Sequence, residues 1–451
     1  MKNFLKNRWV KFSAVAIIYT LWFVVWNQNL WFLLGLPVIF DIYITKYLAR
    51  LVRWEKHEER KRKNKTYREV WSWIDAIIFA LVFAWLINIY IFQMYTIPTS
   101  SMEKTLLVGD YLYVSKATYG PRVPNTPLSL PLMHHTTPWG TKSYSEAIKL
   151  PYKRLAGLRG VERGDIVVFN FPAGDTVILE RQNETYYDIV RQFTSTYGEK
   201  RGRELMNRQY HVTSRPVDKR EHYVKRCVAV AGDTLQVQKG VLYVNGTEQD
   251  YIDNQQYIYF VQTSSPLSRK SIERLGVSPD EVHYAASAGI YTMPLTESAV
   301  EMLSGMSNVV SVTRNESTEP YLAIFPNNVN YPWTEDNFGP LWVPSKGATV
   351  ALSVENLPLY ERIIKNYECH DLRVEDGKIY IDGVERTDYT FEMDYYFMMG
   401  DNRHMSADSR YWGFVPEDHV VGTPSFVWLS LDKYKPFPSN IRWERMFKAH
   451  K

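Results

Sequence analysis

The chain has 451 residues, of which 45% are hydrophobic and 23% charged, a balance typical of a folded protein with one large domain or two ordinary ones. Its formal net charge of +4 is modest, and its one dense basic run, residues 60–68, lies between two apolar segments, so a membrane explanation of that run competes strongly with nucleic-acid binding, which would need a concentrated basic face. The two cysteines, Cys227 and Cys369, exclude a disulfide framework and a cysteine-rich zinc site, but one bridge or two free thiols are both compatible with the sequence.

Three apolar segments precede the main body of the chain. The first, about 12–26, follows a basic start and precedes no small-residue cleavage site, which favours an uncleaved anchor over a cleavable signal peptide. The second, about 30–44, is short and contains a proline and an aspartate, so it either crosses with local thinning or re-enters. The third, about 71–94, has the length of a bilayer-spanning helix. We therefore expect about three transmembrane helices, in an anchor over 1–94.

Basic residues predict the orientation of this anchor. The N-terminus and the loop 45–70 are rich in Lys and Arg, whereas the turn at 27–29 contains neither. By the positive-inside rule, the N-terminus and the 45–70 loop are cytoplasmic. Three crossings then place everything after about residue 95 outside, and a re-entrant second segment would reverse that parity.

The remainder of the chain predicts a mainly β fold. Short stretches that alternate in polarity or are rich in β-branched residues recur between Gly, Pro, Asn and Asp, the pattern of many short strands. These stretches are 111–114, 166–169, 223–230, 234–237, 241–244, 378–381 and 425–429. Helices are expected only over Tyr187–Gly198 and Leu357–Asn366.

Two stretches of this β region resemble each other. Residues 235–246 and 372–383 each consist of a strand, a Gly turn and a second strand ending in Asn-Gly or Asp-Gly, dipeptides that supply the positive φ of tight hairpins. Two independent hairpins and an internal duplication explain this likeness equally well. Between them, residues 247–356 are polar, rich in Tyr and interrupted by Pro and Asn. We expect an inserted β-rich lobe there and identify no chemistry in it.

Three polar segments contain candidate catalytic residues. Ser101, among small residues, closely follows the third apolar span, where an enzyme outside the membrane would meet a substrate still held in the bilayer. Lys225 lies near the start of a mostly apolar strand, where desolvation would lower the pKa of its amine. The alternative for Lys225 is a strand-edge lysine that reaches solvent. Residues 398–413 form a polar loop of the kind that positions catalytic groups. The alternative for that loop is a structural turn with two ion pairs, Asp408–Arg410 and Asp401–Arg226.

Taken together, these segments resemble the bacterial type I signal peptidases, the Ser–Lys leader peptidases, whose motifs occur here in the family's order. The matching segments are Ile97-Pro98 with Ser101-Met102, Arg163–Phe169, Lys225-Arg226 with Gly232-Asp233, and Gly400–Arg410. The sequence departs from the family at Ser100, where many members have Gly, and at His404-Met405, where some have Asp-Asn. A lone histidine is rarely a ligand or a catalyst, so His404 is not expected to bind metal.

The resemblance implies a signal-peptidase-like β catalytic domain and a membrane-bound serine endopeptidase that removes signal peptides from exported preproteins. Ser101 would be the nucleophile and Lys225 its general base, acting through an acyl-enzyme. The main-chain N–H of Ser101 and the hydroxyl of Thr99 would form the oxyanion hole, and Ser406 would orient the Lys225 amine. The residues that would brace the site are Arg226, Asp401, Asp408 and Arg410. No metal or organic cofactor is expected. The implied catalytic domain comprises 95–246 and 357–435, followed by a tail at 436–451.

The resemblance also implies partners and a location. Substrates of the family carry small residues at the −1 and −3 positions, which requires shallow apolar pockets. We expect these pockets to be lined by the apolar residues nearest to the site in sequence, namely Tyr95, Ile97, Pro98, Met102, Leu106, Tyr223, Val224 and Met398. The partners would be preprotein signal peptides, the lipid bilayer and the export machinery, with no nucleic acid. The location would be the bacterial cytoplasmic membrane, with the catalytic domain on the extracytoplasmic side.

Three alternatives compete with this interpretation. A catalytically silent, membrane-tethered binding protein of the same fold would have no need to keep both Ser101 and Lys225. A self-cleaving Ser–Lys protein like the SOS-response repressors would have a DNA-binding domain and no apolar spans. The endoplasmic-reticulum type of signal peptidase has His at the position of Lys225.

Overall fold

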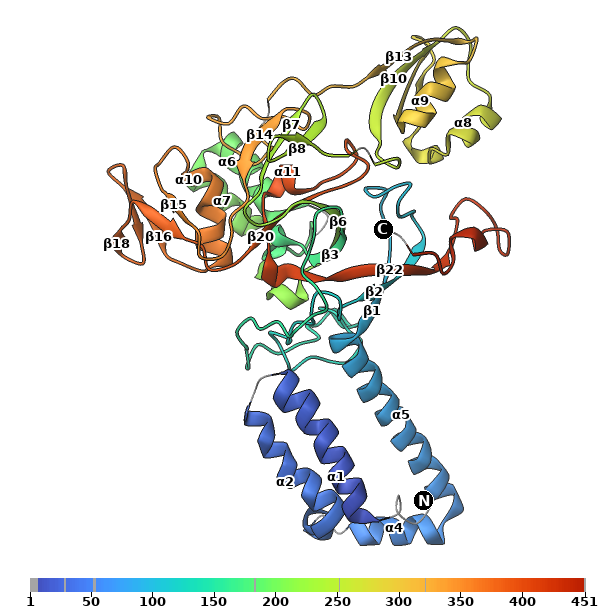
Figure 1. Ribbon diagram of the computed structural model, residues 1–451, viewed down its shortest axis with the longest axis vertical. Coiled ribbons are helices and arrows are strands. Elements are labelled where there is room, and N and C mark those ends of the chain that lie inside the picture. The colour runs from blue at the N-terminus through green and yellow to red at the C-terminus, as the bar shows by residue number, and fades with distance from the viewer. Residues whose placement is uncertain are drawn as a thin grey trace.

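The computed structural model describes residues 7–27, 30–51, 54–181, 184–250, 252–320 and 322–449. A helical stem leads into a β-rich body, and a small sheet with two helices projects from the far side of that body (Figure 1). The prediction of a mainly β fold is therefore confirmed. The basic residues Lys2 and Lys6 of the expected anchor lie outside the described residues.

The stem contains three apolar helical segments. The first comprises α1 (Arg8–Tyr19) and η1 (Thr20–Trp26), and the third is α5 (Lys65–Tyr90); both are long and apolar enough to cross a bilayer. The second is a shorter apolar helix, Phe32–Thr45, so its crossing stays a prediction. It runs back along the first segment, and the hydroxyl of Tyr19 donates a 2.7 Å hydrogen bond to the carbonyl of Phe32 (Figure 1). The elements of this return segment and of the turn into α5 are η2 (Leu30–Leu34), α2 (Gly35–Phe40), η3 (Asp41–Thr45), α3 (Tyr47–Leu51) and α4 (Trp54–Lys63).

The body is built on a seven-stranded antiparallel sheet. Its strand order is β1 (Phe92–Thr96), β2 (Asp110–Ser115), β22 (Val420–Ser430), β3 (Ile166–Asn170), β6 (His222–Ala229), β20 (Tyr395–Met399) and β21 (Val415–Pro416). Every residue of β3 is buried, because both faces of the sheet are covered. Ile166 and Val168 pack into one hydrophobic cluster, and Val167 and Phe169 into another, as the two-residue period of a strand requires. The sheet therefore separates two cores.

Smaller sheets and helices surround this central sheet. The strands are β14 (Phe338–Trp342), β7 (Thr234–Gln238), β8 (Val241–Val244) and β9 (Thr247–Glu248) in one sheet, β16 (Leu372–Glu375), β17 (Lys378–Ile381) and β18 (Val384–Glu385) in another, and the pairs β15 (Thr349–Ala351) with β19 (Asp388–Thr390) and β4 (Thr176–Ile178) with β5 (Val212–Ser214). The helices are α6 (Tyr186–Tyr197), α7 (Glu199–Gln209), α10 (Leu357–Arg362), η7 (Ile363–Tyr367) and α11 (Ser409–Trp412). Each of the seven predicted strand stretches falls on an observed strand, and both predicted helices begin within one residue of an observed helix.

Both predicted hairpins are present. In the β7–β8 hairpin, Lys239 and Gly240 have φ values of 49° and 77°, and in the β16–β17 hairpin Asp376 and Gly377 have 50° and 76°. These left-handed pairs are what a two-residue turn needs to match the twist of its strands.

The inserted segment contains a sheet of its own. Its strand order is β11 (His283–Ala285), β12 (Ile290–Leu295), β10 (Tyr257–Thr263) and β13 (Val309–Arg314), covered by α8 (Arg269–Leu275) and α9 (Glu297–Ser304). A separate core that includes Val261, Met293 and Leu303 holds it together. We call residues 257–314 the lobe. The later strand β14 pairs instead with β7 of the body.

Candidate active site

Ser101 lies on a tight turn just after the first strand of the body. β1 starts at Phe92, two residues after α5 ends at Tyr90. The turn is closed by main-chain hydrogen bonds from Glu103 to Ser100 (2.9 Å) and from Leu106 to Met102 (2.7 Å). Its apolar residues Met102 and Leu106 are fully buried, so packing fixes the turn and leaves the hydroxyl of Ser101 pointing at its partner.

Lys225 brings its amine to this hydroxyl from the middle of the sheet. It lies on β6 opposite Val167 of β3, and only 3% of the residue is exposed. Its Nζ donates a hydrogen bond to Oγ of Ser101 over 2.5 Å. Burial lowers the pKa of the Lys225 amine to about 8; the carboxylates of Asp408 and Asp401 act against that shift, and Arg410 adds to it.

Two buried ion pairs surround the amine. Arg226 donates to both carboxylate oxygens of Asp401 at 2.8 Å, and Thr105 donates to Asp401 over 2.6 Å. Arg410 donates to both oxygens of Asp408 at 2.9 and 2.8 Å. The structure thus brings together the four residues that the sequence predicted would brace the site. Each carboxylate is neutralised by an arginine, which leaves the amine of Lys225 without an ion pair of its own among the described residues.

The two hydroxyls with predicted supporting roles lie in different environments. Ser406 is buried, but its Oγ has no hydrogen-bond partner in the described part of the chain, so no bond to Lys225 is made. It packs against Gly400, where a Cβ would lie 2.3 Å from its Oγ and 2.6 Å from the carbonyl oxygen of Ser101. Thr99 is exposed. The main-chain N–H of Ser101 has no acceptor among the described residues.

Sequence reasoning missed Asn402, which holds the main chain at Ser101. Its N–H donates to the carbonyl of Ser101 over 3.1 Å, and its side-chain amide donates to the carbonyl of Ser100 over 3.3 Å. Asn402 lies inside the final matched segment, but residue type alone does not indicate that it binds backbone atoms of the distant turn.

The predicted pocket residues divide between the two cores. The first core holds Tyr95, Ile97, Met102, Leu106 and Val224. Tyr223 and Met398 belong to the core on the other face, and Pro98 is exposed. Tyr223 also lines a cavity with Phe171, Ala407 and Trp412.

Two strand edges near Ser101 lack a partner strand among the described residues. β1 pairs with β2 alone and forms one end of the seven-stranded sheet. β6 pairs with β20 only from Arg226 onward, so the edge at 222–225 is free of that strand. The rings of Tyr95 on β1 and His222 on β6 lie 4.8 Å apart, which places the two edges next to each other.

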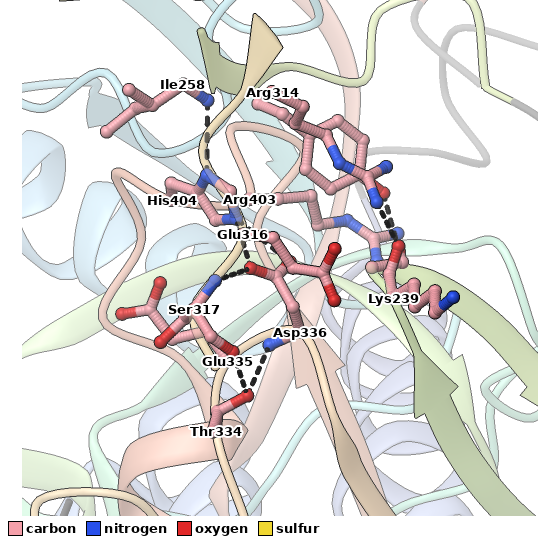
Figure 2. Close-up of polar contacts among 12 residues, drawn as sticks. Lys239, Ile258, Arg314, Glu316, Ser317, Thr334, Glu335, Asp336, Arg403 and His404 are labelled. Carbon is pink, nitrogen blue, oxygen red and sulfur yellow. Dashed lines mark hydrogen bonds and ion pairs between the residues drawn. The ribbon is translucent and has the colours of Figure 1, made fainter. Parts of the chain in front are cut away.

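His404 and the two cysteines make their own contacts, apart from the Ser101–Lys225 pair. Figure 2 shows His404 between Ile258 and Asp336; its Nδ1 accepts the N–H of Ile258 over 3.1 Å and its Nε2 contacts the carboxylate at 2.9 Å. Cys227 is buried and Cys369 exposed, and both are free thiols, so the question that the sequence left open is answered. The described residues contain no cluster of three or more His, Cys, Asp or Glu side chains that would hold a metal ion.

Comparisons with known proteins identify the family to which the chain is similar. A family model described as signal peptidase, peptidase S26, matches residues 70–289 and 350–429. Signal peptidase I of Haemophilus influenzae is 24% identical over 87% of this chain and 80% of its own length. Signal peptidase I of Buchnera aphidicola (subspecies Acyrthosiphon pisum) is 23% identical over 87% and 86%, and that of Helicobacter pylori J99 is 23% identical over 84% and 91%.

Proposed function

This chain belongs to the signal peptidase family, peptidase S26, and we propose that it removes N-terminal signal peptides from exported preproteins with Ser101 as nucleophile and Lys225 as general base. The observation that carries this proposal is the 2.5 Å contact between the two side chains inside a water-excluded site. A serine hydroxyl is a weak nucleophile until an adjacent base takes its proton, and a buried amine with a pKa of about 8 is partly neutral at working pH.

The reaction would proceed in two halves. Neutral Lys225 takes the proton of Ser101 as Oγ attacks the scissile carbonyl, and the ammonium then returns that proton to the leaving amine, so that an ester-linked acyl-enzyme forms. Lys225 next activates a water for attack on the ester, which releases the signal peptide and restores Ser101. The free N–H of Ser101 and the hydroxyl of Thr99 would donate to the oxyanion, a donor of this kind being worth roughly 3–4 kcal/mol.

The substrate would bind as an added strand. An extended peptide can pair its main chain with a free sheet edge, while pockets select alternate side chains. The free edges of β1 and of residues 222–225 converge beside Ser101. A cleavage segment with small residues at −1 and −3 would present those side chains to the first core, which includes Ile97 and Val224.

The arrangement of the anchor supports the proposal that the substrate reaches the active site from the membrane. α5 is long and apolar enough to span a bilayer and leads directly into β1. The basic helix α4 lies at the opposite end of the stem from the body (Figure 1). We infer that α4 is cytoplasmic and the body extracytoplasmic in the bacterial cytoplasmic membrane; contact with the export machinery is part of the same proposal.

Cleavage of a preprotein with a small-x-small site tests the proposed dyad. Wild type should cut after that site, whereas Ser101→Ala and Lys225→Ala should fall to background while remaining folded by circular dichroism. Lys365→Ala is the matched control, because that amine is half-exposed and pairs with Glu361. Retained cleavage by Lys225→Ala would require another base. An inactive wild type in both detergent and lipid would instead favour a membrane-tethered binding protein of the same fold.

A further inference from the structure

The residue that leads into the lobe pairs with the loop that follows β20. The N–H of Gln256 donates to the carbonyl of Asp401 over 2.9 Å, and the N–H of Arg403 donates to the carbonyl of Gln256 over 2.8 Å. Gln256 and Asn402 therefore pair as a parallel β-bridge. The N–H of Asn402 in turn donates to the carbonyl of Ser101. The loop of Asn402 therefore links the strand entering the lobe to the main chain of the nucleophile.

His404 strengthens this connection with its side chain. Only 4% of that side chain is exposed. Because its Nδ1 accepts the N–H of Ile258, its proton lies on Nε2 and is donated to Asp336. Asp336 also accepts the N–H of Ser317, which follows the last lobe strand (Figure 2). His404 thus ties the loop of Asn402 to both the entry and the exit of the lobe.

A second contact reaches the nucleophile turn directly. Nζ of Lys104 donates to the carbonyls of Leu275 (3.0 Å) and Gly276 (2.6 Å), at the C-terminal end of α8, where a positive charge is favoured. Lys104 itself has φ of 69°, an unfavourable left-handed conformation for a lysine. Such a conformation persists where its surroundings hold it, and the surroundings here include the lobe.

Two carboxyl groups lie buried at the same contact. Glu103 of the turn and Glu281 of the lobe are more than nine-tenths buried. Burial, with Glu281 nearby, raises the pKa of Glu103 to about 7. The lobe therefore excludes water from this side of the turn as well as holding it.

We propose that the lobe positions Ser101 for attack, with Lys104 and His404 as its two attachments. This inference rests on the proposed role of Ser101. It gives the lobe a task in catalysis that requires no residue of the lobe to touch substrate. Small displacements of a reacting group lower turnover steeply, since about 1 Å can cost roughly a hundredfold.

Lys104→Met in the full-length protein tests the first attachment. We expect kcat to fall roughly ten- to a hundredfold while KM stays within about twofold, and amide hydrogen exchange over residues 100–106 to speed up. Lys104→Arg, which keeps donors for the two carbonyls, should recover most of the loss. Lys433→Met is the matched control, because Lys433 also joins the body to the lobe, through an exposed ion pair with Asp280, but makes no hydrogen bond or ion pair with residues 100–106 in the described part of the chain. It should behave as wild type.

His404→Leu tests the second attachment, and His404→Gln, which keeps a donor for Asp336, is its partial rescue. Unchanged kcat and unchanged hydrogen exchange in Lys104→Met would overturn the proposal. It would also be overturned if the kcat of His404→Leu, calculated per folded enzyme, equals that of wild type. Failure of the proposed function would look different, because Ser101→Ala would then still cut.

Discussion

At the scale of single residues, the site depends on the environment of one amine. Lys225 is buried, its nearest carboxylates are each paired with an arginine, and its hydrogen-bond partner is a hydroxyl. Burial therefore dominates, and the pKa falls from 10.5 to about 8. That shift corresponds to roughly 3 kcal/mol of bias against the ammonium form, which is what a general base needs near neutral pH.

The activity should accordingly follow the titration of Lys225. Below a pH of about 8 the amine is mostly protonated and cannot accept the proton of Ser101. We expect kcat/KM to rise about tenfold per pH unit from pH 6 and to level off above about pH 8. Initial rates of preprotein cleavage between pH 5 and 10 would measure this. A profile that stays flat down to about pH 5 is incompatible with Lys225 as the base.

The sequence predicted some of the residues around this site and missed others. Ser101, Lys225 and the two arginine–carboxylate pairs come together from segments that the motifs had singled out. Asn402 was not predicted, because its contacts are with main-chain carbonyls that any residue type supplies. The orienting role given to Ser406 stays a prediction, since its hydroxyl makes no hydrogen bond among the described residues.

At the scale of elements, strands were predicted better than helices. The buried strand β3 and the Gly-containing hairpins have strong local signals, namely an apolar run and turn residues with positive φ. α7 was missed because only Gly202 and Met206 of its residues are buried, too few for a visible apolar period. α9 follows an N-capping threonine, Thr296. A threonine at this position is a helix-start signal in the sequence, but it did not lead to a predicted helix.

The loop that follows β20 depends on the absence of one side chain. At Gly400, a Cβ would lie 2.3 Å from Oγ of Ser406 and 2.6 Å from the carbonyl oxygen of Ser101. Gly400→Ala should therefore displace the nucleophile turn, lower kcat by roughly a hundredfold and cost about 1–3 kcal/mol of stability by overpacking. Gly160→Ala is the control, because a Cβ there meets nothing within 4 Å. Preprotein cleavage gives kcat, and thermal unfolding gives the stability. A wild-type kcat in Gly400→Ala would contradict this prediction, because the loop would then accommodate the methyl group without displacing Ser101.

At the scale of the whole molecule, the stem has two different ends. The basic helix α4 and the β body lie at opposite ends of it (Figure 1). Trp26 reaches the body, where its Nε1 donates to the carbonyl of Ala156 over 3.4 Å, and its ring lies 5.9 Å from that of Tyr90 at the end of α5. Aromatic residues at that level are typical of a membrane interface, so the stem and body meet where lipid would end.

Native and introduced thiols can test the resulting orientation. Cys369 is exposed on the body. Cys227 is fully buried, so it should not react with the label and serves as an internal negative control. In right-side-out membrane vesicles, a membrane-impermeant maleimide should label Cys369 without permeabilisation. In a Cys369→Ser background, the thiol introduced by Arg62→Cys, at an exposed position of α4, should react only after the bilayer is opened. The opposite pattern would reverse the parity of the stem and place the active site in the cytoplasm, where exported preproteins have not yet crossed. Labelling of both thiols in sealed vesicles would place α4 and the body on the same side, so that α5 would not cross the membrane. A second apolar segment that does not cross would instead give the opposite pattern, because α4 would then lie outside and the body inside.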